Sequence, residues 1–341
     1  MMDMQGAIRA LTEGRDLSAA EMEAAMRIVM TGEATQAQIG GFLIALRMKG
    51  ETVAEIAAAA KVMRELATAV HVTGDHIIDI VGTGGDGTST FNISTTCAFV
   101  VAACGGQVAK HGNRSVSSSS GAADLLEAVG VRVDLGPEAI AQCVHEVGVG
   151  FMFAPNHHAA MRHAIGPRRE MAVRTVFNLL GPLTNPASAP NQLLGVFAEE
   201  WVEPVAHVLA RLNSNHVLVV HSDDGMDEIS IGAPTSVAEL REGSVSTYKI
   251  APSDFGIAEA PLSSVVVSNV EESEAVVRAV LDNEPGPARD IVLLNAGAAL
   301  YAADLTDSIA TGIDMARNSL ASGQALQRVE MLAELSQKLA P

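Results

Sequence analysis

Residues 76–112, HIIDIVGTGGDGTSTFNISTTCAFVVAACGGQVAKHG, decide the fold class of this chain. The apolar run HIIDIV is followed by four glycines in six residues, by the longer apolar stretch NISTTCAFVVAACGG, and by a second short run, QVAKHG. Their lengths and flanking glycines indicate a buried strand, a glycine loop, a helix and a second strand. A strand–helix–strand unit of this kind predicts a parallel sheet with helices packed against it.

The alternation of strands and helices continues toward the C-terminus. Further strands are predicted in GFMFAP, QLLGVF, HVLVVHS and SVSTYKI, with helices such as VEPVAHVLARLN between some of them. We expect an α/β fold with a central, mostly parallel sheet that is flanked by helices on both faces. The stretch EMAVRTVFNLLGPLTNPAS breaks the alternation and predicts an apolar helix followed by a turn rich in Gly, Pro and Asn.

The first seventy residues predict a small helical unit. Capping boxes precede three apolar-periodic runs, at Ser18–Glu21, Thr35–Gln38 and Thr52–Glu55. Glycines after Thr31 and Lys49 supply helix stops. We therefore expect a helical domain at 1–72, joined by about 168–190, and an α/β domain made of 73–167 and 191–341.

Composition and charge limit the function classes. Hydrophobic residues make up 48% of the 341 residues and aromatic residues only 3%, which suits aliphatic helices packed on a parallel sheet. A net charge of −18 disfavours nucleic-acid and anionic-membrane partners. The start, MMDMQGAIRALTEG, lacks the apolar core of a secretory signal, and Cys97, Cys104 and Cys143 have no CxxC spacing. These features predict a cytoplasmic protein with reduced thiols in its core.

The glycine loop satisfies the pattern G-x-G-x-x-G with Gly82, Gly84 and Gly87, which suggests a dinucleotide site. Such a site also needs an acidic residue about 20 positions on, at the end of the second strand, to hold the ribose hydroxyls. That strand ends in Lys110 and His111, and no Asp or Glu occurs between Gly87 and Ala123. The dinucleotide interpretation therefore fails at the position that should decide it.

The same residues fit a multiply phosphorylated anion. Glycines let backbone N–H groups approach phosphate oxygens, and a helix that begins near Asn92 directs its positive dipole end to the same place. Side-chain donors follow, namely Thr90, Asn92, Ser94 and Thr95 in the first loop and Lys110, Asn113, Arg114 and a run of serines in the second. Two donor-rich loops on neighbouring strand ends predict a ligand with two separated phosphate groups, the alternative being two solvated turns.

An acidic cluster follows the strand HVLVVHS. It contains Asp223, Asp224, Asp227 and Glu228. One or two carboxylates at a strand end, together with phosphate oxygens, suit Mg²⁺; the alternative is a solvated turn. Asp227 and Glu228 open an apparent strand, EISI, and we expect them to be better anchored than the preceding pair.

Five motifs taken together resemble one family. In chain order they are GTGGDG, NIST, KHGNRSVSS, RTVFNLLGPLTNPA and DGMDEIS. The chain resembles the anthranilate phosphoribosyltransferases over essentially its whole length. The resemblance implies transfer of the 5-phosphoribosyl group from phosphoribosyl diphosphate (PRPP) to the amine of anthranilate, with release of diphosphate, in tryptophan synthesis. It also implies Mg²⁺ as the metal and a homodimer formed through the helical domain.

The resemblance assigns site residues. PRPP would contact Gly82, Gly85, Asp86, Thr90, Asn92, Ile93, Ser94, Thr95, Lys110, His111, Gly112, Asn113, Arg114, Ser115, Val116, Ser117, Ser118 and the position of Ala122. Mg²⁺ would be held through Ser94, Asp227 and Glu228. Anthranilate would contact Gly82, Asn113 and Arg168, with Arg168 facing the carboxylate; adjacent Arg169 leaves this assignment open by one residue.

The sequence departs from the family at two positions near the second loop. The family usually has Lys at position 119 and Ser at position 122, where this chain has Ser119 and Ala122. One positive charge and one hydrogen-bond donor are therefore missing here. Neither residue lies at the reacting centre, and we expect somewhat weaker PRPP binding without a change of reaction.

The residue types predict a mechanism that depends on placement and electrostatics. Diphosphate leaves readily once its charge is neutralised, so the transition state should resemble a ribosyl oxocarbenium ion. No certain catalytic side chain is expected; His111 could move a proton or support its neighbours. We expect His157 and His158 to line an anthranilate tunnel or to be structural, with a metal role disfavoured because adjacent side chains diverge.

Two rival functions remain at this stage. A nucleoside phosphorylase of the pyrimidine-specific group shares the glycine loop, but would need a base-binding set in place of RTVFNLLGPL. A non-catalytic relative that binds nucleic acid would need a basic surface, which a net charge of −18 opposes.

Overall fold

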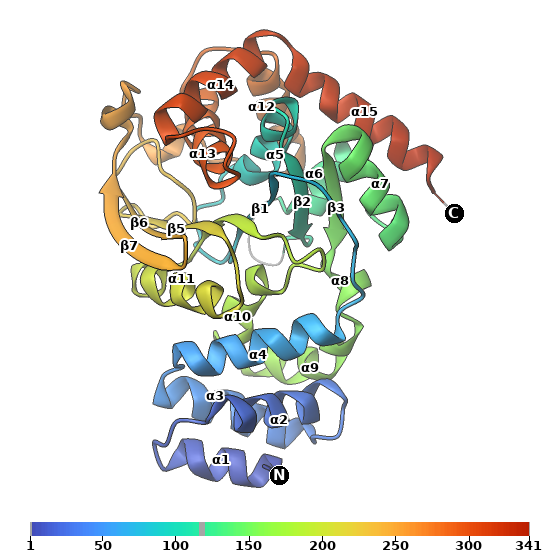
Figure 1. Cartoon of the computed structure of the whole chain (residues 1–341), viewed down its shortest axis with the longest axis vertical. Helices are drawn as coiled ribbons and strands as arrows, with labels where there is room; N and C mark the ends of the chain where they lie inside the picture. The colour runs from blue at the N-terminus through green and yellow to red at the C-terminus, as the bar shows by residue number, and fades with distance from the viewer. Residues whose placement is uncertain (1, 116–119, 341) are drawn as a thin grey trace.

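The computed structural model describes residues 2–115 and 120–340 of the chain. It begins with four helices, α1 (Met4–Thr12), α2 (Ala19–Met30), α3 (Gln36–Lys49) and α4 (Val53–Leu66). The three predicted capping boxes are confirmed, because each hydroxyl accepts from the N3 backbone and each N3 side chain accepts from the cap N–H. Helices α2 and α3 end where the glycine stops predict. In Figure 1 these helices form the lower part of the molecule.

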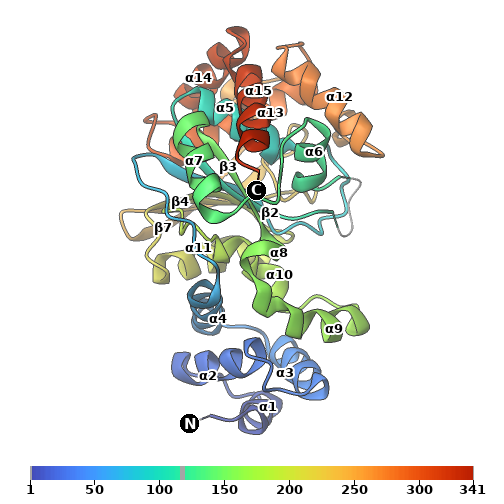
Figure 2. The same cartoon turned by 90° about the vertical axis from the view of Figure 1, so that its right-hand side faces the viewer.

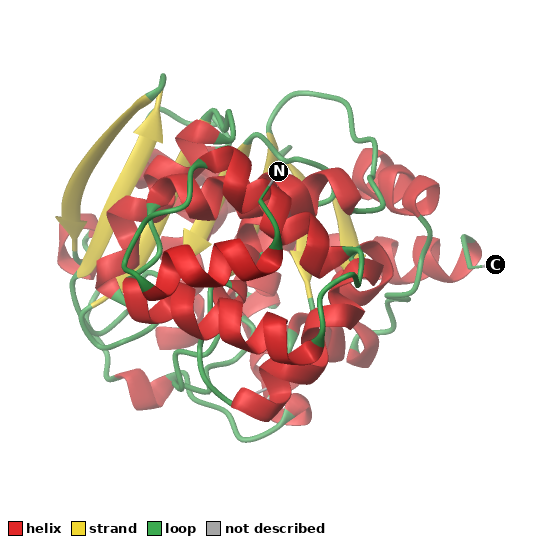
Figure 3. Cartoon of the chain, turned by 90° about the horizontal axis from the view of Figure 1, so that it is seen from below, coloured by secondary structure: helices red, strands yellow, loops and turns green. Residues whose placement is uncertain are grey.

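A seven-stranded sheet occupies the middle of the molecule in the order β3-β2-β1-β4-β5-β6-β7. Its strands are β1 (Ile77–Gly82), β2 (Gln107–Gly112), β3 (Val149–Phe153), β4 (Asn191–Gly195), β5 (His216–Ser222), β6 (Thr235–Arg241) and β7 (Ser244–Ile250). Strands β1 to β5 are parallel, and β6 and β7 run antiparallel at one edge. The prediction of a mostly parallel sheet is therefore confirmed. Figure 3 shows strands emerging at one side of the helices when the molecule is seen from below.

Helices cover both faces of the sheet. Alternate residues of β5 point to opposite sides, Leu218 and Val220 into one apolar core and Val217 and Val219 into the other. The first core is built with α5 (Ile93–Ala103), α6 (Ala122–Ala128), α7 (Pro137–Val147), α12 (Val270–Leu281), α13 (Pro287–Ala302), α14 (Ile309–Ala321) and α15 (Gln324–Lys338). The second joins α11 (Val202–Arg211) to α4, so that the N-terminal helices share a core with the lower face of the sheet.

The segment between β3 and β4 returns to the N-terminal helices. It contains α8 (Ala154–His157), α9 (Arg162–Met171) and α10 (Phe177–Leu180). Helix α9 packs against α3 and α2, and α10 packs against α4; Figure 2 shows α9 beside α3. The domain boundaries given above stay a prediction.

The apolar helix expected across EMAVRTVFNLL is wrong in its extent. Helix α9 ends at Met171 because Ala172 adopts a left-handed conformation, with φ 50°. The chain becomes helical again only for the four residues of α10, where Oδ1 of Asn178 accepts from the Thr175 N–H at 2.9 Å. The break leaves Val173 and Arg174 exposed between the two helices.

Cys97, Cys104 and Cys143 are free thiols, as predicted, and burial raises the pKa of each. Within residues 2–115 and 120–340, no helix combines the length and apolar character needed to cross a membrane.

Candidate active site

Two glycines let the acidic segment cross the carboxyl ends of the central strands. A Cβ on Gly195, the last residue of β4, would lie 1.5 Å from the backbone oxygen of Asp227. A Cβ on Gly82, the last residue of β1, would lie 2.3 Å from Oδ2 of the same residue. Both distances are far inside van der Waals contact, so Asp227 reaches the glycine loop only because these two strand ends carry no side chain.

The glycine loop is held open in a left-handed conformation. Gly84, Gly85 and Gly87 have φ values of 63°, 75° and 78°. The Gly84 N–H donates to Oδ2 of Asp227 at 2.7 Å, and Asp86 accepts from the Thr88 backbone N–H at 3.2 Å and hydroxyl at 2.5 Å. Successive left-handed residues turn neighbouring N–H groups toward one side, which forms a concave cradle for an anion.

Lys110 is a buried cation that contacts β1 and the start of α5. It points from β2 across β1, where its Nζ donates to the Ile80 carbonyl at 2.5 Å and to the Ser94 hydroxyl at 3.2 Å. Burial lowers its pKa, while the negative charges of Asp79 and Glu228 oppose that shift. The structure thus brings Lys110, Ser94 and Glu228 together, from three segments of the chain.

Asn92 joins the two donor-rich loops. Its Oδ1 accepts from the Ser120 hydroxyl and from the Ser273 hydroxyl, both at 2.7 Å, and its Nδ2 donates to the Ser120 carbonyl at 3.3 Å. The side chain predicted to contact the ligand therefore also fixes the end of the second loop against the start of α5. Val116, Ser117, Ser118 and the departure at Ser119 lie outside the described residues.

The described part of the second loop is turned partly toward α6. Arg114 forms ion pairs with Asp124 and Glu127, and its guanidinium lies 5.5 Å from the centre of the Phe153 ring. Asn113 is exposed and its Oδ1 accepts from the Arg114 N–H at 2.8 Å. Ala122 is the first residue of α6 and is half-buried beside this loop. The Arg114 guanidinium is thus engaged by protein carboxylates in this state.

The acidic cluster divides into two pairs. Asp223 is exposed and pairs with Lys249 at 2.8 Å, and Asp224 accepts from the hydroxyls of Ser222 and Ser230 at 2.5 and 2.6 Å. Asp227 and Glu228 instead lie beside Gly84 and Ser94, whose backbone N–H groups donate to the two carboxylates. Only the second pair therefore faces the cradle.

The apparent strand EISI is wrong. Ile229 has no strand neighbour; its N–H and carbonyl pair with the amide side chain of Asn295 on α13, at 2.9 and 2.8 Å. Because a side chain satisfies this backbone, the segment can cross the sheet edge instead of joining it.

Mutual repulsion shapes the electrostatics of the facing carboxylates. Burial, followed by the charge of Asp86, raises the pKa of Asp227 to about 7. Burial, followed by the charge of Asp227, raises the pKa of Glu228 to about 8. A divalent cation would relieve this repulsion. Among the described residues no group of three or more His, Cys, Asp or Glu is arranged to hold a metal.

Three histidines gather on the other side of β2. His111 and His158 meet edge to face with ring centres 5.1 Å apart, while Nδ1 of His157 bonds the Thr68 carbonyl at 2.8 Å. Each ring has a buried Nε2 without a hydrogen-bond partner among the described residues. Burial lowers the pKa of His111 to about 3 and that of His158 to about 4, so these rings are neutral. Neutral rings with an open nitrogen suit a polar organic ligand.

Arg168 and Arg169 differ in their surroundings. The Arg168 guanidinium is half-buried and lies 5.1 Å from the centre of the Phe177 ring, and burial lowers its pKa. Arg169 is exposed. These surroundings favour Arg168 as the partner of a ligand carboxylate.

Comparisons with known proteins cover the whole of this arrangement. A glycosyl transferase family model for a helical bundle domain matches residues 5–67, and the corresponding a/b domain model matches 74–326. The anthranilate phosphoribosyltransferase of Thioalkalivibrio sulfidiphilus is 63% identical, over 98% of this chain and 99% of that protein. That of Alkalilimnicola ehrlichii is 60% identical, over 99% of this chain and 100% of that protein.

The chain belongs to the anthranilate phosphoribosyltransferase family. The crystal structure of the Thermus thermophilus anthranilate phosphoribosyltransferase superposes with a TM-score of 0.92 at 44% identity, covering 97% of this chain and 99% of that one. The Saccharomyces cerevisiae enzyme in complex with PRPP and Mg superposes with a TM-score of 0.90 at 27% identity, covering 98% of each chain. The resemblance inferred from the five motifs is confirmed, and so is the fold class.

Sequence reasoning missed two members of the site. Asp79 is a lone acid inside the apolar strand HIIDIV; it accepts from the His111 N–H at 3.2 Å and from Nδ2 of Asn185 at 2.7 Å, and Nδ2 of Asn185 also donates to the Ala109 carbonyl at 2.8 Å. Burial raises the pKa of Asp79 to about 6, while Lys110 opposes the shift. The only sequence signal was the isolated carboxylate itself, because a buried acid needs partners.

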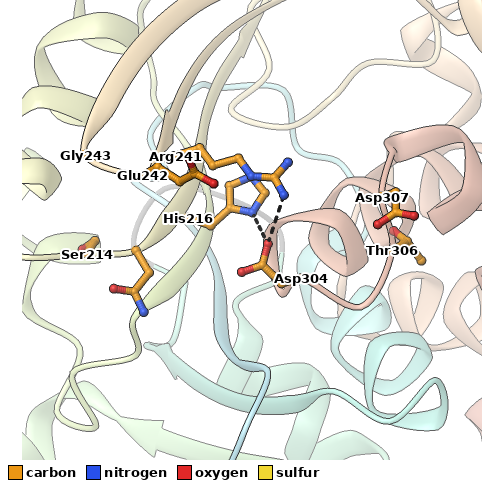
Figure 4. Close-up of a pocket in the computed structure, with 9 residues that line it drawn as sticks. Ser214, His216, Arg241, Glu242, Gly243, Asp304, Thr306 and Asp307 are labelled. Atoms are coloured by element: carbon orange, nitrogen blue, oxygen red, sulfur yellow. Dashed lines mark hydrogen bonds and ion pairs between the residues drawn. The ribbon is translucent and has the colours of Figure 1, made fainter.

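A cavity of about 450 Å³ lies at the amino end of β5, away from the carboxyl ends of the strands that carry the site described above. Figure 4 shows it beside His216, whose two ring nitrogens lie 2.8 and 3.1 Å from carboxylate oxygens of Asp304 and Glu239. His216 is at the amino end of β5, whereas the two donor-rich loops follow the carboxyl ends of β1 and β2. The family's motifs do not reach this cavity.

Magnesium affinity is expected to rise with pH between about 6 and 8. Asp227 and Glu228 have raised pKa values, so protons occupy them at pH 6 and must leave before a cation binds. The apparent dissociation constant for Mg²⁺ with PRPP present should fall at least tenfold over this interval, as measured by titration calorimetry in two buffers to count released protons. An affinity independent of pH would contradict the carboxylate assignment.

Proposed function

We propose that the chain transfers the 5-phosphoribosyl group of PRPP to the amine of anthranilate, giving N-(5-phosphoribosyl)anthranilate and diphosphate, the second step from chorismate to L-tryptophan. The observation that carries this proposal is the meeting of the glycine cradle, Lys110 and the Asp227–Glu228 pair at one sheet edge, in a member of this family. Family membership favours this reaction over the phosphorylase and nucleic-acid alternatives.

PRPP would lie across the two loops. The backbone N–H groups of residues 85–87 and the start of α5 would receive one phosphate end, and the loop after Lys110 the other. Arg114 would exchange its carboxylate partners on α6 for phosphate when the loop binds the ligand. A Ser at position 122 would add one donor, so we expect PRPP to bind somewhat more weakly with Ala122 there.

Ser94, Asp227 and Glu228 would hold Mg²⁺, whose charge neutralises the leaving diphosphate. Relatives support this choice, since the Saccharomyces cerevisiae enzyme has been solved with PRPP and Mg. Lys110 adds a fixed positive charge beneath the same point, held by the Ile80 carbonyl and protected from water by burial. These preset charges act without reorganising as the glycosidic bond breaks.

Anthranilate would enter on the side of the three histidines. Arg168 would pair with its carboxylate and hold the amine toward the ribose carbon. The amine is already nucleophilic, so the chain needs no strong base; Nε2 of His111 faces no protein partner among the described residues, but with its pKa lowered to about 3 by burial it is only a weak acceptor for the proton that the amine loses. A relative supports the aromatic substrate, because the Saccharomyces cerevisiae enzyme has been solved with 4-fluoroanthranilate, at a TM-score of 0.88.

Replacing Arg168 by Ala is expected to raise the KM for anthranilate about 10- to 150-fold. A charge-assisted pair with a carboxylate contributes roughly 1.5–3 kcal/mol when it is shielded from water. The KM for PRPP should change less than threefold, and Arg169→Ala should leave both constants within threefold. An equal loss in the two variants, measured by steady-state kinetics, would contradict the assignment of Arg168.

The chain is also proposed to act in the cytoplasm as a homodimer through its helical part. Four exposed apolar side chains lie in or beside that part, Met48 at 84%, Ile165 at 46%, Val173 at 43% and Leu66 at 38% relative exposure. Light scattering coupled to size-exclusion chromatography measures the mass of the particle in solution. A stable dimer should persist at a protein concentration of about 10 μM, so a monomer at that concentration would contradict the proposal.

The fluorescence of anthranilate provides the direct test of the reaction. It should be lost only when the enzyme, PRPP and Mg²⁺ are all present, and chelation with EDTA should stop the loss. If the fluorescence stayed constant at micromolar enzyme with PRPP and Mg²⁺ present, the proposed transferase activity would be wrong.

A further inference from the structure

Arg174 connects the glycine loop to the N-terminal helices, and none of the roles above includes it. Its Nη2 donates to the Gly85 carbonyl at 2.5 Å, and its guanidinium lies 4.2 Å from the centre of the Phe197 ring, just past β4. Its own backbone carbonyl accepts from Nη1 of Arg47, in the last turn of α3, at 2.6 Å. One residue thus contacts the loop after β1, the segment after β4, and the helical part.

The bond to Gly85 fixes the direction of a peptide unit in the cradle. A trans peptide is planar, so the N–H of Asp86 points opposite to the Gly85 carbonyl that Arg174 holds. Gly85, which precedes this unit, is left-handed and carries no side chain, so rotation about its Cα–C bond would otherwise cost little. On the other side, the Gly84 N–H is held by Asp227.

We propose that Arg174 is a positioning residue that sets the orientation of the Gly85–Asp86 peptide for the phosphates of PRPP and couples it, through Arg47, to the position of α3. This inference rests on the proposed function. Arginine suits the task because its planar guanidinium can stack on Phe197 while donating in its own plane, which a lysine ammonium cannot do. The phosphate cradle then has its donor geometry only when the helical part is docked.

The test uses the full-length enzyme with Arg174→Gln, Arg174→Lys, Arg47→Gln and the double variant Arg47→Gln/Arg174→Gln. Arg174→Gln should raise the KM for PRPP about tenfold and weaken PRPP–Mg²⁺ binding in calorimetry equally, with the KM for anthranilate within twofold. Arg174→Lys should recover less than half of this loss. Arg47→Gln should raise the KM for PRPP about threefold in the parent and not at all once Arg174 is Gln, since the connection is then already broken. Exposed Arg211→Gln on α11 is the matched control.

Three results would overturn the inference while the parent enzyme remains active: an unchanged KM for PRPP in Arg174→Gln, full recovery in Arg174→Lys, or an Arg47→Gln effect that persists in the double variant. A parent enzyme that consumes no anthranilate would instead overturn the proposed function, and the calorimetric PRPP affinities would still decide the role of Arg174. Melting temperatures within about 2 °C of the parent separate loss of positioning from loss of folding.

Discussion

Replacing Glu228 by Gln is expected to lower kcat/KM for PRPP by about 100- to 1000-fold. The substitution keeps the volume of the side chain but removes one of the two carboxylates that face the cradle, and with it much of the attraction for Mg²⁺. Loss of one preset electrostatic contact at a developing charge costs roughly this factor. Steady-state kinetics at saturating anthranilate, over a range of Mg²⁺ concentrations, measures it. Higher Mg²⁺ should restore part of the rate, because the defect is in binding the cation.

The neighbouring acids provide the control. Asp223→Asn alters an exposed side chain that pairs with Lys249, so its effect on kcat/KM should stay within about threefold. Equal losses in Asp223→Asn and Glu228→Gln would show that the whole acidic turn acts by its overall charge. That result would contradict the assignment of the second pair to the metal.

Replacing Gly195 by Ala is expected to cost about 3 kcal/mol of unfolding free energy and to lower kcat/KM about 100-fold. The new Cβ would lie 1.5 Å from the Asp227 carbonyl oxygen, and that neighbour is backbone, so the acidic segment has to move away from the strand end. Overpacking against backbone typically costs one to three kcal/mol or more, and here it also displaces a metal-facing carboxylate. Urea unfolding and steady-state kinetics measure the two effects.

Gly136→Ala is the matched substitution. Gly136 caps α7 with φ −78°, and nothing lies within 4 Å of its Cβ position, so we expect less than about 1 kcal/mol and unchanged kinetics. If Gly195→Ala were as mild as Gly136→Ala, the close crossing of the acidic segment over β4 would be wrong.

The fold was largely predictable because its signals are local. A hydroxyl with a carboxylate or amide three residues later closes a capping box whatever lies around it, and all three predicted boxes formed. Apolar runs bounded by glycines predicted the parallel strands, because this signal is also local in the sequence. The wrong predictions, at residues 228–231 and after Met171, are places where a distant partner or a single left-handed residue overrides the apolar pattern, and strand β6 (Thr235–Arg241) was not predicted at all.

The site was predictable as two loops and an acidic pair, because glycine, hydroxyl and carboxylate chemistry is visible in the letters. The supports of the site were not visible. Asn185 reaches Asp79 across 106 positions, and Arg174 reaches Gly85 across 89, so neither contact leaves a local pattern. Asn92 was expected to face the ligand, and its second task of fixing Ser120 appears only in three dimensions.

A crystal structure of the enzyme with PRPP and Mg²⁺ would show whether the two loops and the acidic pair form one site. We expect one phosphate end of PRPP against the backbone N–H groups of the loop that follows Gly82, the other end against the loop that follows Lys110, and the cation on Asp227 and Glu228. PRPP bound to only one of the two loops, or a cation held away from both carboxylates, would contradict this arrangement.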